Sequence, residues 1–434
     1  MEYALAESYL LATINETVSR RMPYRLERMR AFLHELGNPQ DAYPTIHIGG
    51  TSGKGSTSTI VAAALQAAGK RVGLHTKPHL RSMTERVRVN GLPISQERFA
   101  QFLETMMPAI ERTMESHGRP TYYETLLALA FLAFAQESVE VAVIEVGLGG
   151  RLDGTNVIVP RVAAITTVGY DHQDVLGETL EEIAMEKAGI AKPNVPLVVG
   201  VEDADARRVI LEHAAAVGAP AIELRNAATL DEMRMLRDAQ AFAVRTPRGR
   251  YDIVTTMLGE FQRHNAAMAI AILEQLDDGL RPSISAVQSA LGPLVIPGRM
   301  EVYRGYPTVV FDIAHNAEKA DHLVRSLRET FGDRRFSFVV AVSESKDATE
   351  IVRALASVSA SFTFTTFETA GRHAIKPARL ASIAESVGAW GRAVSDPVEA
   401  LAIARRNGAA DDVVVVTGST FIVAQLREWW LVAA

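Results

Sequence analysis

A glycine-rich turn between an apolar strand and a helix is the part of this sequence best suited to chemistry. The segment Ile46–Ser56 reads IHIGGTSGKGS and is followed by the small-residue run Thr57–Leu65. Glycines let backbone N–H groups approach phosphate oxygens, and the N-terminus of a following helix adds positive potential. Lys54 can pair with terminal phosphate oxygens, and a hydroxyl of Ser56 or Thr57 can ligate Mg²⁺. The segment therefore predicts a nucleotide phosphate site.

This turn departs from the standard P-loop pattern in two places. Ile48 stands where that pattern has Gly, and Gly55 separates Lys54 from Ser56. A glycine-rich turn between a strand and a helix can also serve the fold alone, so the interpretation needs support from other residues.

Two groups that can ligate a metal follow later strands. Glu145 lies inside the apolar run VAVIEVGLGG, where a carboxylate is costly unless it is paired or metal-bound. Asp171 and His172 follow the next predicted strand. Beside a phosphate loop these groups suit Mg²⁺, because water and phosphate oxygens fill its remaining positions. The alternatives are a Glu145 that caps N–H groups of its glycine turn and a loop His172 bonded to backbone.

Two further motifs allow both a chemical and a purely structural interpretation. Lys187 ends an amphipathic helical pattern, where a lysine is usually a solvated cation favoured by the helix dipole. Carbamylation by CO₂ would instead make Lys187 an anionic metal ligand. Asp312 and His315 follow a strand near the chain's end. Asp312 can hold ribose hydroxyls and His315 can reach phosphate or a transferred proton, or the segment is an Asx-type turn that opens a helix.

The elements around these motifs alternate between strands and helices. Such alternation predicts a mostly parallel sheet with ligands at the carboxyl ends of its strands, where the motifs repeatedly lie. After the Pro- and Gly-punctuated Leu291–Arg299 a fresh alternation begins, so we expect two α/β domains, 1–296 and 297–434. The first is a P-loop-type ATPase domain and the second a smaller Rossmann-like domain. Strands are predicted at Val72–His75, Val141–Val146, Val162–Val168, Thr308–Asp312, Phe336–Val342, Phe362–Phe367 and Val413–Thr417, and helices at Thr121–Ala135, Lys319–Thr330, Thr349–Ala356 and Pro397–Arg406.

Composition and charge indicate a soluble cytoplasmic enzyme. The 434 residues are 48% hydrophobic and 22% charged, as in ordinary globular proteins. No apolar run approaches the ~20 residues of a membrane span, and MEYALAESYLLATINE does not resemble a signal peptide. The net charge of −6 argues against a dedicated nucleic-acid binder. The lack of cysteine excludes disulfides, thiolate metal sites and Cys nucleophiles.

In this order the motifs resemble those of the folylpolyglutamate synthase/dihydrofolate synthase family within the Mur ligase superfamily. The resemblance spans nearly the whole chain, and several of its motifs are long. The matching segments are GGTSGKGS (49–56), KPHL (77–80), ERVRVNG (85–91), VIEVGLGGRLDGTNV (143–157), DHQDVLGETLEEIAMEKAGIAKP (171–193), LGEFQRHNAAMAI (258–270), PGRME (297–301) and DIAHN (312–316), with weaker matches at SKD (345–347) and TGSTFIV (417–423).

The resemblance implies a monomeric two-domain ATP-dependent amide ligase with a pair of Mg²⁺ ions, and it is compatible with a K⁺ requirement. Its small-molecule substrates would be ATP, L-glutamate and a folate or pteroate acceptor, joined through an acyl phosphate as two domains close over ATP. The resemblance implies that phosphate is bound by Thr51, Ser52, Gly53, Lys54, Gly55, Ser56 and Thr57, and that the nucleotide is contacted by Gln262 and Asn265 from the first domain and by Arg299 and Asp312. It implies that metal is bound by Ser56, Glu145, His172 and carbamylated Lys187. The implied catalytic residues are Lys54, Lys187 and His315.

Departures from the family pattern leave the acceptor open. Ser52 stands where Asn is usual, Lys77 where Ser is typical and Tyr170 where Leu is usual. Lys77 and Tyr170 are candidates for the acceptor pocket. The hypotheses are therefore a folate ligase acting on dihydropteroate, reduced folates or both; a relative redirected to another carboxylic acid or amino acid; and a nucleotide switch without ligase activity, against which the complete set of site residues argues.

Overall fold

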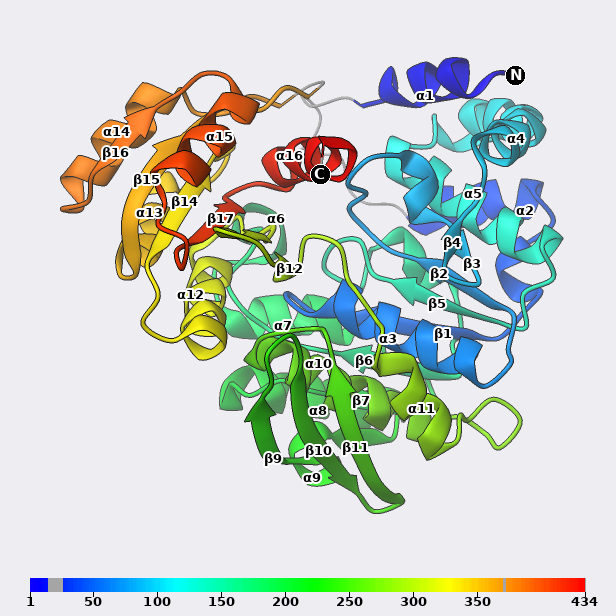
Figure 1. Ribbon diagram of the computed structural model, residues 1–434. Coiled ribbons are helices and arrows are strands. Elements are labelled where there is room, and N and C mark those ends of the chain that lie inside the picture. Colours follow the sequence, from blue (N-terminus) through cyan, green and yellow to red (C-terminus); the bar gives the residue numbers. More distant parts are fainter. Residues whose placement is uncertain (15–25, 370–371, 434) are drawn as a thin grey trace. The chain divides into compact units, whose positions relative to one another are not determined.

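The computed structural model describes residues 1–14, 26–369 and 372–433, and its contacts divide the chain into two compact units (Figure 1). The predicted single boundary at 296/297 lies close to the last division, at Leu294/Val295. Two segments earlier in the chain, which the sequence places in the first domain, make most of their contacts with the second unit. Unit 1 comprises Met1–Arg234, Ala241–Val254 and Arg263–Leu294, and unit 2 comprises Met235–Gln240, Thr255–Gln262 and Val295–Ala434.

Unit 1 is built on an eight-stranded sheet in the order β4-β3-β2-β5-β1-β6-β7-β8. All neighbours from β2 to β8 pair in parallel, whereas β3 and β4 add an antiparallel edge. The predicted, mostly parallel sheet is thus confirmed. The strands are β1 (Thr45–Gly49), β2 (Val72–His75), β3 (Arg88–Val89), β4 (Leu92–Pro93), β5 (Val141–Glu145), β6 (Val162–Ile165), β7 (Leu197–Val199) and β8 (Ala221–Glu223).

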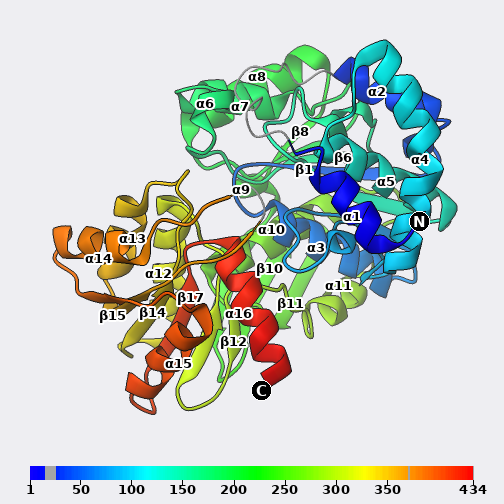
Figure 2. The same ribbon diagram turned by 90° about the horizontal axis from the view of Figure 1, so that it is seen from above.

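Helices bury the sheet of unit 1 because their apolar faces pack on it and on one another. Figures 1 and 2 show α2, α4 and α5 gathered together, and α7 beside α8, in agreement with their packing contacts. Over the described residues, no helix has both the length and the apolar composition needed to cross a membrane. The helices are α1 (Tyr3–Leu11), α2 (Leu26–Glu35), α3 (Lys54–Ala67), α4 (Gln96–His117), α5 (Tyr122–Gln136), α6 (Gln173–Leu176), α7 (Leu180–Ala188), α8 (Ala204–Val217), α9 (Leu224–Ala227), α10 (Glu260–Glu274, which crosses the unit boundary) and α11 (Ile284–Leu291).

The apolar helix predicted at Thr121–Ala135 is α5, and its local sequence explains where it begins. Thr121 and Glu124 form a capping box, which satisfies N–H groups of the first turn. Nearly every side chain from Glu124 to Phe134 is buried. The Glu124 carboxylate is paired with Arg28 of α2, at 2.9 Å, which offsets the cost of burying both charges.

A second sheet of three strands, in the order β11-β10-β9, was not predicted from the sequence. Its strands are rich in exposed charges, and Arg245 and Arg250 both pair with Glu232 across them. Its strands are β9 (Thr229–Met235), β10 (Gln240–Thr246) and β11 (Gly249–Thr255).

Unit 2 contains a six-stranded sheet in the order β12-β13-β17-β14-β15-β16, parallel except for β12. The central strand β17 is buried at every position, as its VVVVT sequence requires of a parallel strand covered on both faces. The predicted second α/β unit is confirmed. Its elements are β12 (Glu301–Tyr303), β13 (Thr308–Phe311), α12 (Ala317–Phe331), β14 (Phe336–Val340), α13 (Ala348–Ala356), β15 (Ser359–Phe364), α14 (Pro377–Ser386), β16 (Gly391–Ala393), α15 (Pro397–Asn407), β17 (Val413–Thr417) and α16 (Thr420–Ala433).

His47 is a buried titratable group at the centre of the unit 1 sheet. It lies in β1 with no exposed surface, and its Nε2 is 2.8 Å from the Thr155 hydroxyl. Burial, assisted by the charge of Lys192, lowers the pKa of His47 to about 3. The folded chain therefore holds His47 neutral at pH values where the unfolded chain protonates it.

We expect the free energy of unfolding to fall as pH drops from about 6.5 toward 3, because protons then favour the unfolded chain. Between pH 7 and pH 5 the contribution of His47 is about 2 kcal/mol. Urea denaturation of the native protein and of His47→Gln at both pH values measures it. Equal pH dependence in the two proteins would contradict the prediction.

Candidate active site

The glycine-rich turn lies between β1 and α3, as the sequence predicts. Gly50 has φ +134° and Gly53 has φ +83°, conformations that favour glycine. A Cβ atom on Gly53 would lie 2.5 Å from Oδ1 of Asn265, which is therefore placed against the turn. Both residues belong to unit 1. Gln262, the other predicted nucleotide contact in α10, is buried and falls in unit 2.

The segment after β6 fixes the shape of this turn. The Thr51 N–H donates to the Thr167 carbonyl at 2.8 Å, and the Ser52 N–H donates to the Thr167 hydroxyl at 2.9 Å. The Thr166 hydroxyl donates to the Ser52 carbonyl at 2.6 Å. Sequence reasoning missed Thr166 and Thr167. Two threonines directly after an apolar strand were the available signal.

Lys54 folds back over the turn from the start of α3. Its Nζ donates to the carbonyls of Gly50 at 2.7 Å and Thr51 at 3.1 Å. Ser56 and Thr57, in the first turn of α3, are buried. A lysine, two hydroxyls and a helix N-terminus thus converge on one loop, which is the arrangement that binds phosphate.

Glu145 ends β5 beside the first turn of α3. It is 3% exposed, and its Oε2 accepts a hydrogen bond from the Lys77 N–H at 3.0 Å. A Cβ atom on Gly55 would lie 3.3 Å from the same oxygen. The carboxylate is therefore next to the phosphate loop, where the sequence predicts a metal ligand.

Asp153 holds the glycine turn that follows β5, and sequence reasoning missed it. Its carboxylate accepts from the N–H groups of Leu148 at 2.8 Å and Thr155 at 3.0 Å. The Tyr123 hydroxyl donates to it at 3.1 Å. A Cβ atom on Gly147 would approach both Tyr123 and Asp153. Asp153 is therefore a cap of this glycine turn.

His172 and Lys187 differ in their access to solvent. His172 is exposed and has φ +53° at the N-cap of α6, with its Nε2 3.8 Å from the Asp171 carboxylate. Lys187 lies in the last turn of α7 and is only 3% exposed. The interpretation of Lys187 as a solvated cation is therefore wrong. A buried lysine at a helix end demands another explanation.

The Asp312–Asn316 segment of unit 2 is an Asx turn that leads into α12. The Asp312 carboxylate accepts from the N–H groups of Met300 and Ala314, both at 2.9 Å, and Asn316 caps α12. Burial raises the pKa of Asp312, and the charge of Arg299 opposes this shift. The interpretation of this motif as an Asx turn that opens a helix is therefore confirmed. Binding of ribose hydroxyls by Asp312 stays a prediction.

His315 is neutral at physiological pH. Burial and the charge of Lys319 lower its pKa to about 3. Its Nδ1 lies 2.8 Å from the Ile313 carbonyl, so that nitrogen carries the hydrogen, and Nε2 lies 3.3 Å from Lys319 Nζ. His315 thus offers a lone pair rather than a positive charge to its surroundings.

Over the described ranges, no three His, Cys, Asp or Glu side chains come close enough together to cage a metal ion. Mg²⁺ does not need such a cage, since it usually binds one or two carboxylates and completes its shell with waters and phosphates. Glu145 and Ser56 beside the phosphate loop fit that pattern.

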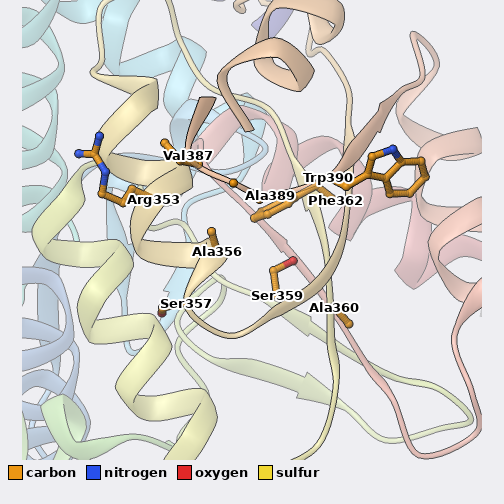
Figure 3. Close-up of a pocket in the computed structure, with 10 residues that line it drawn as sticks. Arg353, Ala356, Ser357, Ser359, Ala360, Phe362, Val387, Ala389 and Trp390 are labelled. Carbon is orange, nitrogen blue, oxygen red and sulfur yellow. The ribbon is translucent and has the colours of Figure 1, made fainter. Parts of the chain in front are cut away.

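A cavity of about 410 Å³ in unit 2 contains none of the predicted site residues (Figure 3). It lies between α13, β15 and the segment before β16. Its lining includes Arg353, Phe362 and Trp390. It is a separate feature of unit 2.

Comparison with known proteins agrees with this geometry. The Mur ligase middle domain family matches residues 48–273, and the Mur ligase glutamate ligase domain family matches residues 298–420. A Bacillus subtilis relative named dihydrofolate synthase/folylpolyglutamate synthase is 34% identical, with 93% of this chain and 94% of that protein aligned. The chain belongs to this family of Mur ligases.

Solved structures of family members share the fold. The Mycobacterium tuberculosis folylpolyglutamate synthase complexed with ADP and AMPPCP has a TM-score of 0.90 at 31% identity, covering 99% of this chain and 98% of that one. Escherichia coli FolC in complex with DHPP and ADP has a TM-score of 0.88 at 28% identity, covering 100% and 98%. The chain is accordingly an ATP-dependent ligase with the fold of its family.

We expect Gly53→Ala to weaken binding of a non-hydrolysable ATP analogue at least tenfold. The added methyl group meets Asn265 and forces the turn out of its positive φ. Gly69→Ala is the matched control, because Gly69 has the same φ of +83° with no atom near its Cβ position. Calorimetric titration measures both affinities, and equal losses in the two variants would contradict the prediction.

Proposed function

We propose that this Mur ligase joins L-glutamate to the carboxylate of a pteroate- or folate-type acceptor, using ATP. The observation that carries the proposal is the loop of Gly50–Gly53 with Lys54, set beside the Glu145 carboxylate at the carboxyl edge of the unit 1 sheet. The names of the aligned relatives, and the DHPP and ADP bound to the E. coli protein, support the substrates.

The reaction we propose has two steps. An acceptor carboxylate oxygen attacks the γ-phosphorus of ATP, and the bond to the β–γ bridging oxygen breaks to release ADP. The glutamate nitrogen then attacks the acyl carbon, phosphate leaves with the former carboxylate oxygen, and the nitrogen loses a proton. Because both partners of the first step are anions, this chemistry depends on charge neutralisation and alignment.

The residues of the loop would divide this work. The resemblance assigns the N–H groups of Thr51–Gly55 to the phosphates. Because Thr51 and Ser52 already donate to Thr167, we assign the phosphates to the N–H groups of Gly53–Gly55 and to the Lys54 ammonium. Ser56, Glu145 and His172 would hold Mg²⁺. Mg²⁺ neutralises phosphate charge when bound. Asn265 would contact the nucleotide from beside Gly53. We assign the remaining nucleotide contacts, as the resemblance does, to Gln262, Arg299 and Asp312, with His315 near the γ-phosphate.

We further propose that Lys187 is carbamylated and supplies a ligand to a second Mg²⁺. Its burial supports this, since an amine held from water favours the neutral form that reacts with CO₂. The product is an anion that a metal can balance. A K⁺ requirement, a monomeric state and a cytoplasmic location remain predictions of the same proposal.

A redirected acceptor is the alternative that specific residues favour. Lys77 replaces the serine typical of the family, and Tyr170, which replaces a leucine, is 55% exposed. An ammonium in the acceptor pocket suits a substrate with an additional acidic group. This alternative changes the acceptor and keeps the ligase chemistry.

The test is phosphate release from Mg-ATP and L-glutamate with dihydropteroate, tetrahydrofolate or no acceptor, with products identified by mass spectrometry. We expect release that depends on an acceptor and a product heavier by one glutamyl unit. ATP binding without turnover on either pterin would reject the folate acceptor and favour the redirected ligase.

For Lys187 we expect Lys187→Ala to lose most ligase activity, because the ligand for the second metal is removed. Added bicarbonate does not rescue this variant, since alanine has no amine. Lys187→Arg, which keeps a cation that cannot be carbamylated, is expected to fail as well. Near-normal turnover of either variant, measured by phosphate release, would show that Lys187 is not a metal ligand.

A further inference from the structure

Arg299, a predicted nucleotide contact, lies in a tight turn of unit 2 that its sequence favours. The Arg299 N–H donates to the Ile296 carbonyl at 3.2 Å, which closes a turn over Pro297 and Gly298. Proline and glycine suit these central positions, because proline presets its own φ and glycine tolerates the φ of +67° found here. The turn therefore places Arg299 two residues before β12.

The residue after Arg299 has a strained backbone conformation. Met300 has φ +48°, and its side chain is buried in the core of unit 2. A residue with a Cβ atom is sterically disfavoured at such a φ, so neighbouring contacts must maintain it. The Met300 N–H donates to the Asp312 carboxylate at 2.9 Å, and the Ile313 N–H donates to the Gly298 carbonyl at 3.0 Å. The segment after β13 thus holds one side of the turn.

Glu301 holds the other side of the turn. Its buried carboxylate accepts a hydrogen bond on Oε2 from the Gly298 N–H at 2.9 Å. The Tyr303 hydroxyl donates to Oε1 at 2.6 Å. Because Gly298 directly precedes Arg299, a shift of the Glu301 carboxylate would shift the backbone from which the Arg299 side chain extends.

Arg427 of α16 fixes the Glu301 carboxylate, although the two residues are 126 positions apart in the sequence. Arg427 Nε donates to Oε2 at 2.7 Å, and Nη2 donates to Oε1 at 2.9 Å. Two such bonds set the orientation of a carboxylate as well as its location. A buried carboxylate also requires a partner, since an unpaired charge away from water is costly. The guanidinium therefore determines where Glu301 holds the turn.

We propose that the ion pair of Glu301 and Arg427 positions Arg299 toward the nucleotide. Arg427 orients the Glu301 carboxylate, the carboxylate holds the turn, and the turn presents Arg299. This inference rests on the proposed function, which gives Arg299 its contact with ATP. Glu301 and Arg427 are accordingly positioning residues, which act on the nucleotide through Arg299.

The test is a double-variant cycle with Arg299, measured as the affinity of the full chain for a non-hydrolysable ATP analogue with Mg²⁺ in calorimetric titrations. We expect Arg427→Met to weaken binding about fivefold. Arg427→Lys keeps the charge and loses the bidentate geometry, so it should weaken binding about threefold. In the Arg299→Ala background neither substitution should weaken binding further, because the contact that Arg427 positions is already absent.

Arg304→Met is the matched control. Arg304 directly follows β12 and pairs with Asp238 at 2.7 Å, so this variant removes a different ion pair of unit 2. It should bind the analogue as the native protein does. Thermal unfolding of every variant separates stability from affinity, because a purely structural role of Arg427 would lower the Tm and leave the affinity unchanged.

Additive losses from Arg427→Met and Arg299→Ala would overturn the inference, and so would native affinity in a folded Arg427→Met or in Arg299→Ala. If Arg427→Met fails to fold, Arg427→Lys in both backgrounds decides. Glutamyl transfer by the native protein together with additive losses would reject this inference and leave the proposed function standing. Coupled losses in a protein that transfers glutamate to no acceptor would do the reverse. A native protein that does not bind the analogue would reject both.

Discussion

Parallel pairing of β2, β5, β1 and β6 is the constraint on which the rest of unit 1 depends. Because the four strands run in one direction, their carboxyl ends open at one edge of the sheet. Lys77, the turn of Gly50–Gly53 and the pair Thr166–Thr167 follow the ends of β2, β1 and β6, and Glu145 is the last residue of β5. Strand pairing alone therefore brings residues that are far apart in the sequence to the same edge of the sheet.

Backbone geometry and charge then set what that edge can do. The turn keeps its shape because glycines adopt positive φ and because Thr166 and Thr167 bond its backbone. Once the turn is fixed, Lys54 and the N-terminus of α3 give it a positive potential. Glu145 brings negative charge to the same place, so cations are required there.

Local sequence patterns predicted most of the α/β elements, since apolar strands and capped helices carry short-range signals. Val72–His75 and Val413–Thr417 lie where they were predicted. The sheet of β9, β10 and β11 was missed because its strands expose charged side chains and lack a continuous apolar run. Met235–Gln240 and Thr255–Gln262 precede the rest of unit 2 in the chain. They were missed because their tertiary contacts, and not their composition, place them in that unit.

Site residues could be predicted from the sequence where the residue type alone indicates the chemistry. They could not be predicted where the chemistry depends on which residues lie nearby in the fold. Lys54 and Glu145 were predicted from glycine spacing and an acid in an apolar run, and the structure places both at the turn. Burial decided the case of Lys187, because the same helical pattern fits an exposed and a buried lysine. Lys77 illustrates the limit most clearly. The sequence shows an unusual residue, but only the structure shows that its backbone N–H donates to Glu145 at 3.0 Å. Because the pairing of β2 with β5 sets this contact, no local pattern in the sequence around Lys77 could have predicted it.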